Sequence, residues 1–347
     1  MERKVKIGFV GAGFMSQLAH LPSFKEIEGC EVVALAELRP RLREIIADKF
    51  RIPKRYPSHK ELAEDDEIEA VVALFHYLLN AEVACYLLEK GKDVMLEKPM
   101  AFTYELAQTM VDASKKSGRL LMIGFMKRYD PGVQLAKKLI EKLLATGEIG
   151  EPTFVRVHIF GGEWVCNIGT PIFTDEPYPP LPERKADWLH PSLVNMYDEF
   201  INVASHNLNL LRYLLPGDWQ VEDAFLKDTQ LLAVLQRNNL LCSFEYGRLP
   251  AHRWDEDITI YFQKGWLRVE TPPPLLKNVP ARVIFYRTGE EPSYNEPIAP
   301  WGWGFKREAE HFVQCVRERK EPISSGEDSL KDMLLAKDIF LKIAAKL

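Results

Sequence analysis

The fold is decided by residues 5–16, which read VKIGFVGAGFMS. A short apolar run is followed at once by Gly11 and Gly13. A strand that passes through such a turn into a helix is typical of dinucleotide-binding domains. The first glycine allows the tight turn, and the second lets the backbone approach a pyrophosphate.

The residues around this turn refine the prediction. Ser16 stands where a third Gly or Ala is usual, and it is small enough for close helix–strand packing. Phe14 and Met15 open the helix, whose free N–H groups would face the phosphates. About twenty positions further on, Glu37 ends the next strand, where a carboxylate would accept hydrogen bonds from a ribose diol and favour NAD. Arg39 could instead hold the 2′-phosphate of NADP, so both cofactors stay open and NAD is favoured.

From residue 5 to residue 125, short β-branched runs alternate with longer patterns of helical period, which predicts a parallel sheet with helical crossovers. We therefore expect a Rossmann dinucleotide-binding domain over residues 1–127. The expected strands are 5–10, 31–37, 70–74, 93–96 and 120–124, and the expected helices are 14–27, 40–50, 78–90 and 103–117.

The character of the sequence changes after a helix that runs to about residue 146. Strand-like runs joined by polar turns predict an α+β domain over residues 128–347, with a mostly antiparallel sheet covered by helices. Residues 171–191 hold too many prolines for regular structure and are expected to form a long loop. The expected strands are 153–160, 230–236, 241–246, 257–262 and 266–270, and the expected helices are 197–214, 305–319 and 326–346, the last two covering one of the domains.

Composition excludes several classes of protein. The 45 basic and 50 acidic residues give a net charge of −5, which excludes a basic nucleic-acid binder. The five cysteines are scattered singly, so neither a disulfide framework nor a zinc site is expected. No apolar run is long enough to span a membrane, and the start of the chain lacks the pattern of a signal peptide, so we expect a cytoplasmic protein.

Two further elements lie where ligands bind in open α/β sheets. Glu97-Lys98-Pro99 follows the strand 93–96, and residues 124–131, GFMKRYDP, follow the next strand. With the glycine turn, they resemble the Gfo/Idh/MocA (glucose–fructose oxidoreductase / inositol dehydrogenase) family. The likeness continues through residues 205–214, SHNLNLLRYL, and 263–268, QKGWLR, and so covers nearly the whole chain.

The resemblance implies an NAD(P)-dependent dehydrogenase or reductase of a sugar, polyol or related hydroxyl compound. It assigns Lys98 to a place beside the nicotinamide, where an ammonium stabilises the developing alkoxide. It makes His206 the general acid/base, and it places Glu97 and Arg128 on the cofactor side.

The chain departs from the family pattern beside His206. Asn202 stands one helical turn before it, where Asp is usual. An amide can still hold the imidazole by a hydrogen bond, so Asn202 stays a candidate catalytic residue. It supplies no negative charge to the imidazolium, a loss of roughly 1–3 kcal/mol.

A second departure lies after the strand 70–74. Phe75, His76 and Asn80 stand where the family tends to show T-P-n-x-x-H. Contacts to the dinucleotide through the backbone depend little on side chains, so these three residues remain candidates for cofactor binding.

Two alternatives to a dehydrogenase or reductase stay open. The chain could be a redox-neutral NAD-dependent sugar-modifying enzyme, or a non-catalytic ligand sensor on the same scaffold. The resemblance also implies a homodimer or homotetramer through the C-terminal sheet. Glu308 and His311, three residues apart, could bind a metal, but helix-surface charge is the expectation and no metal site is predicted.

Overall fold

The computed structural model describes residues 3–250 and 252–347. The chain divides into two compact units. The first contains the residues up to Phe125 together with Gly169–Lys185 and Phe305–Met333. The second contains Met126–Ile168, Ala186–Gly304 and Leu334–Leu347. The chain therefore returns twice to the first unit, once through a proline-rich segment and once through a C-terminal helix.

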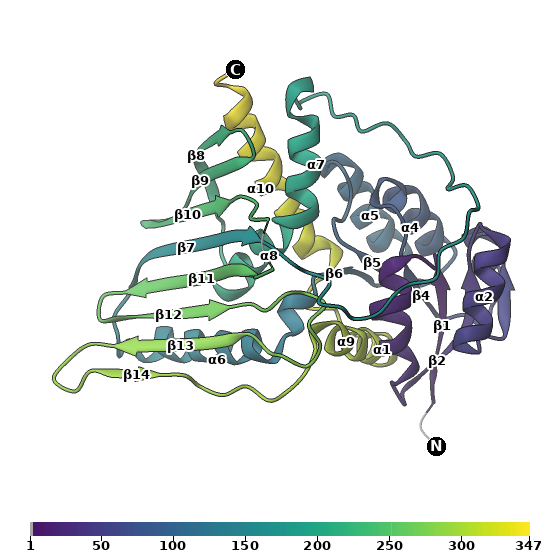
Figure 1. Cartoon of the computed structure of the whole chain (residues 1–347), viewed down its shortest axis with the longest axis horizontal. Coiled ribbons are helices and arrows are strands. Elements are labelled where there is room, and N and C mark those ends of the chain that lie inside the picture. The colour runs from purple at the N-terminus through teal and green to yellow at the C-terminus, as the bar shows by residue number, and fades with distance from the viewer. Residues whose placement is uncertain (1–2, 251) are drawn as a thin grey trace. The chain divides into compact units, whose positions relative to one another are not determined.

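The first unit is built on a six-stranded sheet in the order β3-β2-β1-β4-β5-β6, and every neighbouring pair in it is parallel (Figure 1). This is the predicted Rossmann sheet, and the prediction is confirmed. Its strands are β1 (Val5–Val10), β2 (Cys30–Ala36), β3 (Lys54–Tyr56), β4 (Ala70–Ala73), β5 (Asp93–Glu97) and β6 (Leu121–Gly124).

Local sequence sets the ends of the helices in this unit. Pro40 opens α2, where its missing N–H costs nothing, and the side chain of Thr103 caps α5 by accepting a hydrogen bond from the N–H of Leu106. The expected helix 14–27 is divided, because residues 16–20 are wound as a wider π-helix. The helices are the π-helix η1 (Ser16–His20), α1 (Leu21–Lys25), α2 (Pro40–Phe50), α3 (His59–Ala63), the 3-10 turn η2 (Tyr77–Leu79), α4 (Asn80–Glu89), α5 (Tyr104–Ser117) and α9 (Gly304–Glu318).

The second unit is built on an eight-stranded sheet in the order β14-β13-β12-β11-β7-β10-β9-β8. Only β7 and β10 pair in parallel among its neighbours, so the predicted mostly antiparallel sheet is confirmed. Its strands are β7 (Pro152–Gly161), β8 (Gln220–Lys227), β9 (Gln230–Arg237), β10 (Leu240–Tyr246), β11 (Asp255–Phe262), β12 (Gly265–Glu270), β13 (Arg282–Arg287) and β14 (Ser293–Asn295).

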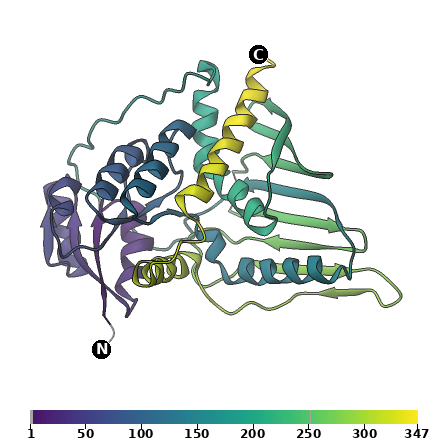
Figure 2. The ribbon, with the colours of Figure 1, turned by 180° about the vertical axis from the view of Figure 1, so that it is seen from behind.

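Helices cover one face of this sheet, and Figure 2 shows α6 lying across it. The expected single helix 197–214 is two helices that meet at Ala204. The helices are α6 (Pro131–Thr146), α7 (Val194–Val203), α8 (Ser205–Leu214) and α10 (Gly326–Ala344), of which α10 contributes residues to both units.

The opposite face of the sheet carries a row of large side chains that the strand register places side by side. We call it the aromatic row. Trp266 stacks on Tyr286 with ring centres 6.0 Å apart, and the remaining members are half-buried or exposed. The row runs across six strands as Tyr294, Tyr286, Trp266, Tyr261, Phe154 and Leu241.

The helices that the structure describes include none long and apolar enough to cross a lipid bilayer.

Candidate functional site

The glycine turn after β1 has the geometry of a dinucleotide cradle. Gly11 has a positive φ of 93°, and a Cβ there would collide with the carbonyl oxygen of Leu74, so only glycine fits. At Gly13 a Cβ would meet no described atom within 4 Å. Open space therefore lies in front of the turn, where helix η1 and the preceding residues Phe14 and Met15 begin a new helical segment. The residues present fit a bound pyrophosphate.

Glu37, at the end of β2, is buried and fully engaged. One carboxylate oxygen accepts the N–H of Ala12 at 2.9 Å, and Arg39 donates through its backbone N–H, Nε and Nη2 at 3.1, 2.9 and 3.0 Å. Burial raises the pKa of Glu37, but the hydrogen bonds from Arg39 and Ala12 outweigh it, and the pKa lies below its ordinary value. Glu37 is therefore an anion whose charge Arg39 neutralises.

The proline-rich segment, Gly169–Lys185, lies against the first unit as the long loop visible in Figure 1. The side-chain amide of Gln17 exchanges two hydrogen bonds with the backbone of Ile172, at 2.8 and 2.9 Å. The carboxylate of Glu176 accepts two backbone N–H groups from the first turn of α2, at 2.8 and 3.1 Å. The loop expected from the prolines thus has fixed contacts.

Tyr178, in the same segment, reaches two predicted cofactor residues. Its ring lies 5.4 Å from the guanidinium carbon of Arg39, a cation–π distance. Its hydroxyl is hydrogen-bonded to the backbone of His76. The proline-rich segment therefore touches the chain just beyond β1, β2 and β4, at the strand ends where dinucleotides bind.

The residues after β4 have structural contacts of their own. The ring of His76 stacks on Tyr77 at 4.8 Å, and burial together with Arg184 lowers the pKa of His76. Phe75 is half-buried beside it. Asn80 is buried, and its amide donates to the carbonyls of the turn after β5 at 3.1–3.3 Å. Asn80 thus holds the turn that carries Lys98.

Lys98 is half-buried directly after β5, and the carboxylate of Glu97 accepts its backbone N–H at 3.1 Å. The other oxygen of Glu97 lies 2.7 Å from Nε2 of His20. The expectation that Glu308 lies on a helix surface was wrong, because it is completely buried near these two residues. The Nε2 of His311 instead accepts the backbone N–H of Ile323.

In the second unit, His206 is buried in the first turn of α8. The amide of Asn202, one turn earlier, donates to the backbone carbonyl of Asp198 at 2.9 Å. Glu199, three residues before Asn202, accepts the hydroxyl of Tyr246 at 2.7 Å and also pairs with Arg248. Its carboxylate is therefore engaged by other residues.

Arg128 lies in this unit as well, buried, with Nε donating to the side-chain oxygen of Asn209 at 2.5 Å. Its neighbour Lys127, which is not among the predicted site residues, pairs with Glu256 inside the unit. Glu256 also accepts Asn207, the residue after His206, at 3.0 Å. The lysine within GFMKRYDP could have indicated this cluster from the sequence, whereas nothing in the sequence indicates that Glu256 is buried.

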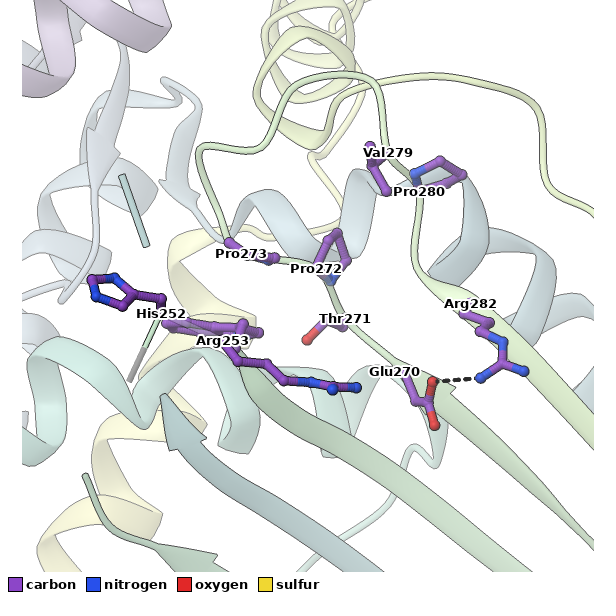
Figure 3. A pocket seen from close by; sticks show the side chains of 10 residues that line it. His252, Arg253, Glu270, Thr271, Pro272, Pro273, Val279, Pro280 and Arg282 are labelled. Carbon is purple, nitrogen blue, oxygen red and sulfur yellow. Dashed lines mark hydrogen bonds and ion pairs between the residues drawn. The ribbon is translucent and has the colours of Figure 1, made fainter. Parts of the chain in front are cut away.

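Glu256 joins this cluster to an open pocket of about 380 Å³ (Figure 3). Its two carboxylate oxygens accept Thr271 at 2.7 Å and Trp254 at 3.0 Å, and both donors line the pocket. Arg253 and Arg282 give the wall positive charge, which Glu270 partly offsets through its ion pair with Arg282. None of the residues predicted for the site lines this pocket.

A family match covers the N-terminal part of the chain. Residues 5–125 match the profile of the Gfo/Idh/MocA family, described as an oxidoreductase family with an NAD-binding Rossmann fold. The chain carries the NAD-binding domain of the Gfo/Idh/MocA family. The resemblance that its motifs indicated is confirmed.

Two similar dehydrogenases differ in how much of the chain they match. Inositol 2-dehydrogenase of Salmonella typhimurium is 32% identical over 169 residues, 48% of each chain, so the chain spans about half the length of that relative. Myo-inositol 2-dehydrogenase of Thermotoga maritima is 23% identical over 95% of this chain and 94% of its own. Among solved structures, aldose-aldose oxidoreductase of Caulobacter crescentus has a TM-score of 0.76 at 20% identity, covering 99% of both chains. That likeness shows that the fold is shared.

Proposed function

We propose that the chain is an NAD(P)-dependent oxidoreductase that interconverts an alcohol and a carbonyl group in a sugar, a polyol or a related compound. One observation carries the proposal. The glycine turn, the Glu37 carboxylate and the turn with Lys98 follow β1, β2 and β5, all at the same edge of one parallel sheet. The names of the inositol dehydrogenase relatives support the substrate class.

The proposed roles follow from the chemistry of each group. When bound, the nicotinamide accepts or donates the hydride. The Lys98 ammonium donates a hydrogen bond to the reacting oxygen and stabilises the negative charge that develops on it. His206 takes the hydroxyl proton or returns it, since imidazole exchanges protons near neutral pH. Asn202 is proposed as a positioning residue one turn away on the preceding helix.

For the cofactor we propose NAD over NADP. Glu37 is an anion that faces the turn through Ala12, and a 2′-phosphate placed beside it would be repelled. The positive charge of Arg39 is already balanced by its ion pair with Glu37. Phe14, Met15, Phe75 and His76, which lie at the same edge of the sheet, would contribute backbone and ring contacts.

We further propose that two copies of the chain associate through the aromatic row. Large apolar side chains gathered on one open sheet face mark a protein–protein surface. Phe154, Leu241 and Tyr294 in the row, and Leu232 and Phe225 on the neighbouring strands, are all among the exposed apolar residues. A homodimer, or a tetramer built from it, would cover them.

The test uses purified, cofactor-free protein. Nicotinamide fluorescence should report binding of NADH, and of NADPH more weakly. A panel of inositols, sugars and polyols with NAD should then yield a substrate that is oxidised with formation of NADH. If neither cofactor binds and no compound is turned over, the proposal fails.

A second candidate function is favoured by the proline-rich segment. This segment touches the loops beyond β1, β2 and β4, so a dinucleotide bound there would be covered and released slowly. A retained cofactor suits a redox-neutral reaction, in which the substrate is oxidised and a second group reduced without exchange of NAD. Product formation without net change in nicotinamide absorbance would favour this candidate.

A further inference from the structure

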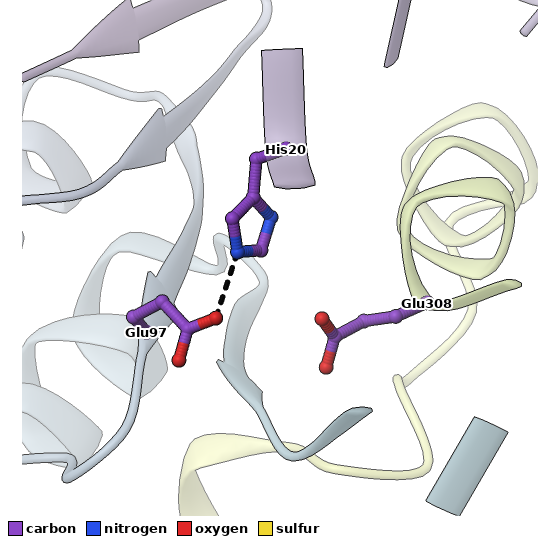
Figure 4. Close-up of side chains that lie close together, drawn as sticks. All are labelled: His20, Glu97 and Glu308. Atoms are coloured by element: carbon purple, nitrogen blue, oxygen red, sulfur yellow. Dashed lines mark hydrogen bonds and ion pairs between the residues drawn. The ribbon is translucent and has the colours of Figure 1, made fainter. Parts of the chain in front are cut away.

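Three ionisable side chains meet inside the first unit, behind the turn that carries Lys98. They are His20 from η1, Glu97 from the end of β5 and Glu308 from α9, and Figure 4 shows them pointing toward one another. Their nearest ligand atoms all lie within 4.8 Å of one another. His20 and Glu308 have no exposed surface, and the side chain of Glu97 is 15% exposed.

The hydrogen bonds within this cluster are unevenly shared. Nε2 of His20 lies 2.7 Å from one oxygen of Glu97, and the other oxygen of Glu97 accepts the backbone N–H of Lys98 at 3.1 Å. Neither carboxyl oxygen of Glu308 has a hydrogen-bond partner among the described residues. The ring of Phe305 packs edge-on against His20 at 5.3 Å and closes one side.

A buried carboxylate without a donor is too costly to persist as an anion. Burial, together with the nearby charge of Glu97, raises the pKa of Glu308 well above its ordinary value. A neutral carboxylic acid is itself a hydrogen-bond donor. The anionic acceptor within the cluster is Glu97.

We propose that Glu308 is a positioning residue that, as a neutral acid, donates a hydrogen bond to the Glu97 carboxylate and with His20 fixes the backbone of Lys98. The nearest oxygens of the two carboxyl groups lie within 4.8 Å and are not hydrogen-bonded in the structure, so the proposed bond requires a small shift of the Glu308 side chain. With that bond, Glu97 has three donors, from His20, Glu308 and the Lys98 backbone. The proposal rests on the proposed function in one respect, since the consequence for turnover assumes that Lys98 contacts the reacting oxygen. The protonation state of Glu308 does not depend on that assumption.

The 2.7 Å contact between His20 and Glu97 favours a shared proton over a metal ion. A divalent cation bound by all three residues would have to separate these two atoms, because it would lie between them. Metal analysis of the purified protein is therefore part of the test.

Two variants separate the possibilities. Glu308→Gln keeps the shape of the side chain and a donor N–H, whereas Glu308→Leu keeps the approximate volume and removes the donor. Glu310→Leu, on a partly exposed position of the same helix, is the matched control. We expect Glu308→Gln to keep near-normal kcat and Glu308→Leu to lower kcat by about tenfold to a hundredfold. KM for the cofactor should change little in either variant.

Infrared spectroscopy provides a readout that needs no substrate. At neutral pH the wild-type protein should show the C=O stretching band of a buried protonated carboxylic acid, and this band should be missing in Glu308→Gln. The inference is overturned if the band is missing from wild type, if Glu308→Gln is as impaired as Glu308→Leu, or if a stoichiometric metal is found that Glu308→Gln loses. Absence of turnover in wild type with the band present would count against the proposed function alone.

Discussion

The guanidinium of Arg39 donates two hydrogen bonds to the carboxylate of Glu37, from Nε to Oε1 at 2.9 Å and from Nη2 to Oε2 at 3.0 Å. With the backbone N–H groups of Ala12 and Arg39, these bonds occupy all the acceptor positions of the carboxylate. A ribose diol must therefore displace one of these donors to bind Glu37, whereas the guanidinium of Arg39 keeps N–H groups that Glu37 does not accept.

The pair therefore sets the cofactor preference. Glu37→Gln removes the negative charge and frees Arg39, so the ratio of NADPH to NADH affinity should rise about tenfold or more, equivalent to about 1.4 kcal/mol. Fluorescence titration with both cofactors measures it. The double variant Glu37→Gln/Arg39→Ala should lose the gain, and an unchanged ratio in Glu37→Gln would contradict the prediction.

Lys98 should matter for turnover far more than for folding. Lys98→Met removes the donor that we propose for the reacting oxygen, and kcat should fall by about 10²–10³. Lys115→Met, on an exposed stretch of α5, is the matched control and should leave kcat unchanged. Steady-state kinetics with the substrate identified in the panel decides the matter, and retention of wild-type kcat would exclude the proposed role.

The proline-rich segment should slow cofactor release. Tyr178→Ala removes the ring on Arg39, so NADH should dissociate about tenfold faster in stopped-flow displacement. Phe173 lies in the same segment and is 70% exposed, so Phe173→Ala serves as the control. Equal dissociation rates in wild type and Tyr178→Ala would mean that the segment does not cover the cofactor.

The aromatic row should govern association. Leu241, 42% exposed in the row, becomes a buried charge at the proposed interface in Leu241→Asp, and the protein should elute as a monomer. Leu144, 40% exposed on α6, offers the comparison Leu144→Asp, which should leave the assembly intact. Light scattering coupled to size exclusion gives the masses. A wild-type monomer would remove the basis for the proposed dimer.

Glu308 should make stability depend on pH. Its pKa in the folded protein is raised, so above the ordinary glutamate pKa the folded state keeps a proton that the unfolded state has lost. The free energy of unfolding then falls as pH rises from that value toward the folded pKa. Denaturant melts across this range should show the fall in wild type and a weaker one in Glu308→Gln. Parallel curves would show that Glu308 does not titrate on unfolding.

Local patterns predicted the parts of the fold that local interactions determine. The helix expected at 40–50 coincides with α2, because Pro40 marks its start and apolar residues mark its buried side. Strands β8, β13 and β14 and the short β3 and α3 were missed. β3, α3 and β14 are only three to five residues long, too short to show a clear period in the sequence.

The residues of the candidate site likewise divide into those that local sequence predicts and those that depend on tertiary packing. Gly11, Glu37 and Lys98 could be found because a turn or a strand end makes a residue type necessary at each. The burial of Glu308 could not be found, since a glutamate on a helix is ordinarily exposed and its burial near His20 and Glu97 depends on tertiary packing. The contacts of Tyr178 lie in a loop without periodicity, where sequence gives no register.

The first unit is completed only by a late segment of the chain. Phe24 of α1 packs on Phe312 of α9 with ring centres 6.4 Å apart, and both are buried. A nascent chain that has left the ribosome only as far as Phe125 has every strand of the Rossmann sheet but leaves this side of α1 bare. The side of α1 that carries Phe24 is thus covered only after α9 has been made. An expression fragment that stops after β6 would leave that side exposed.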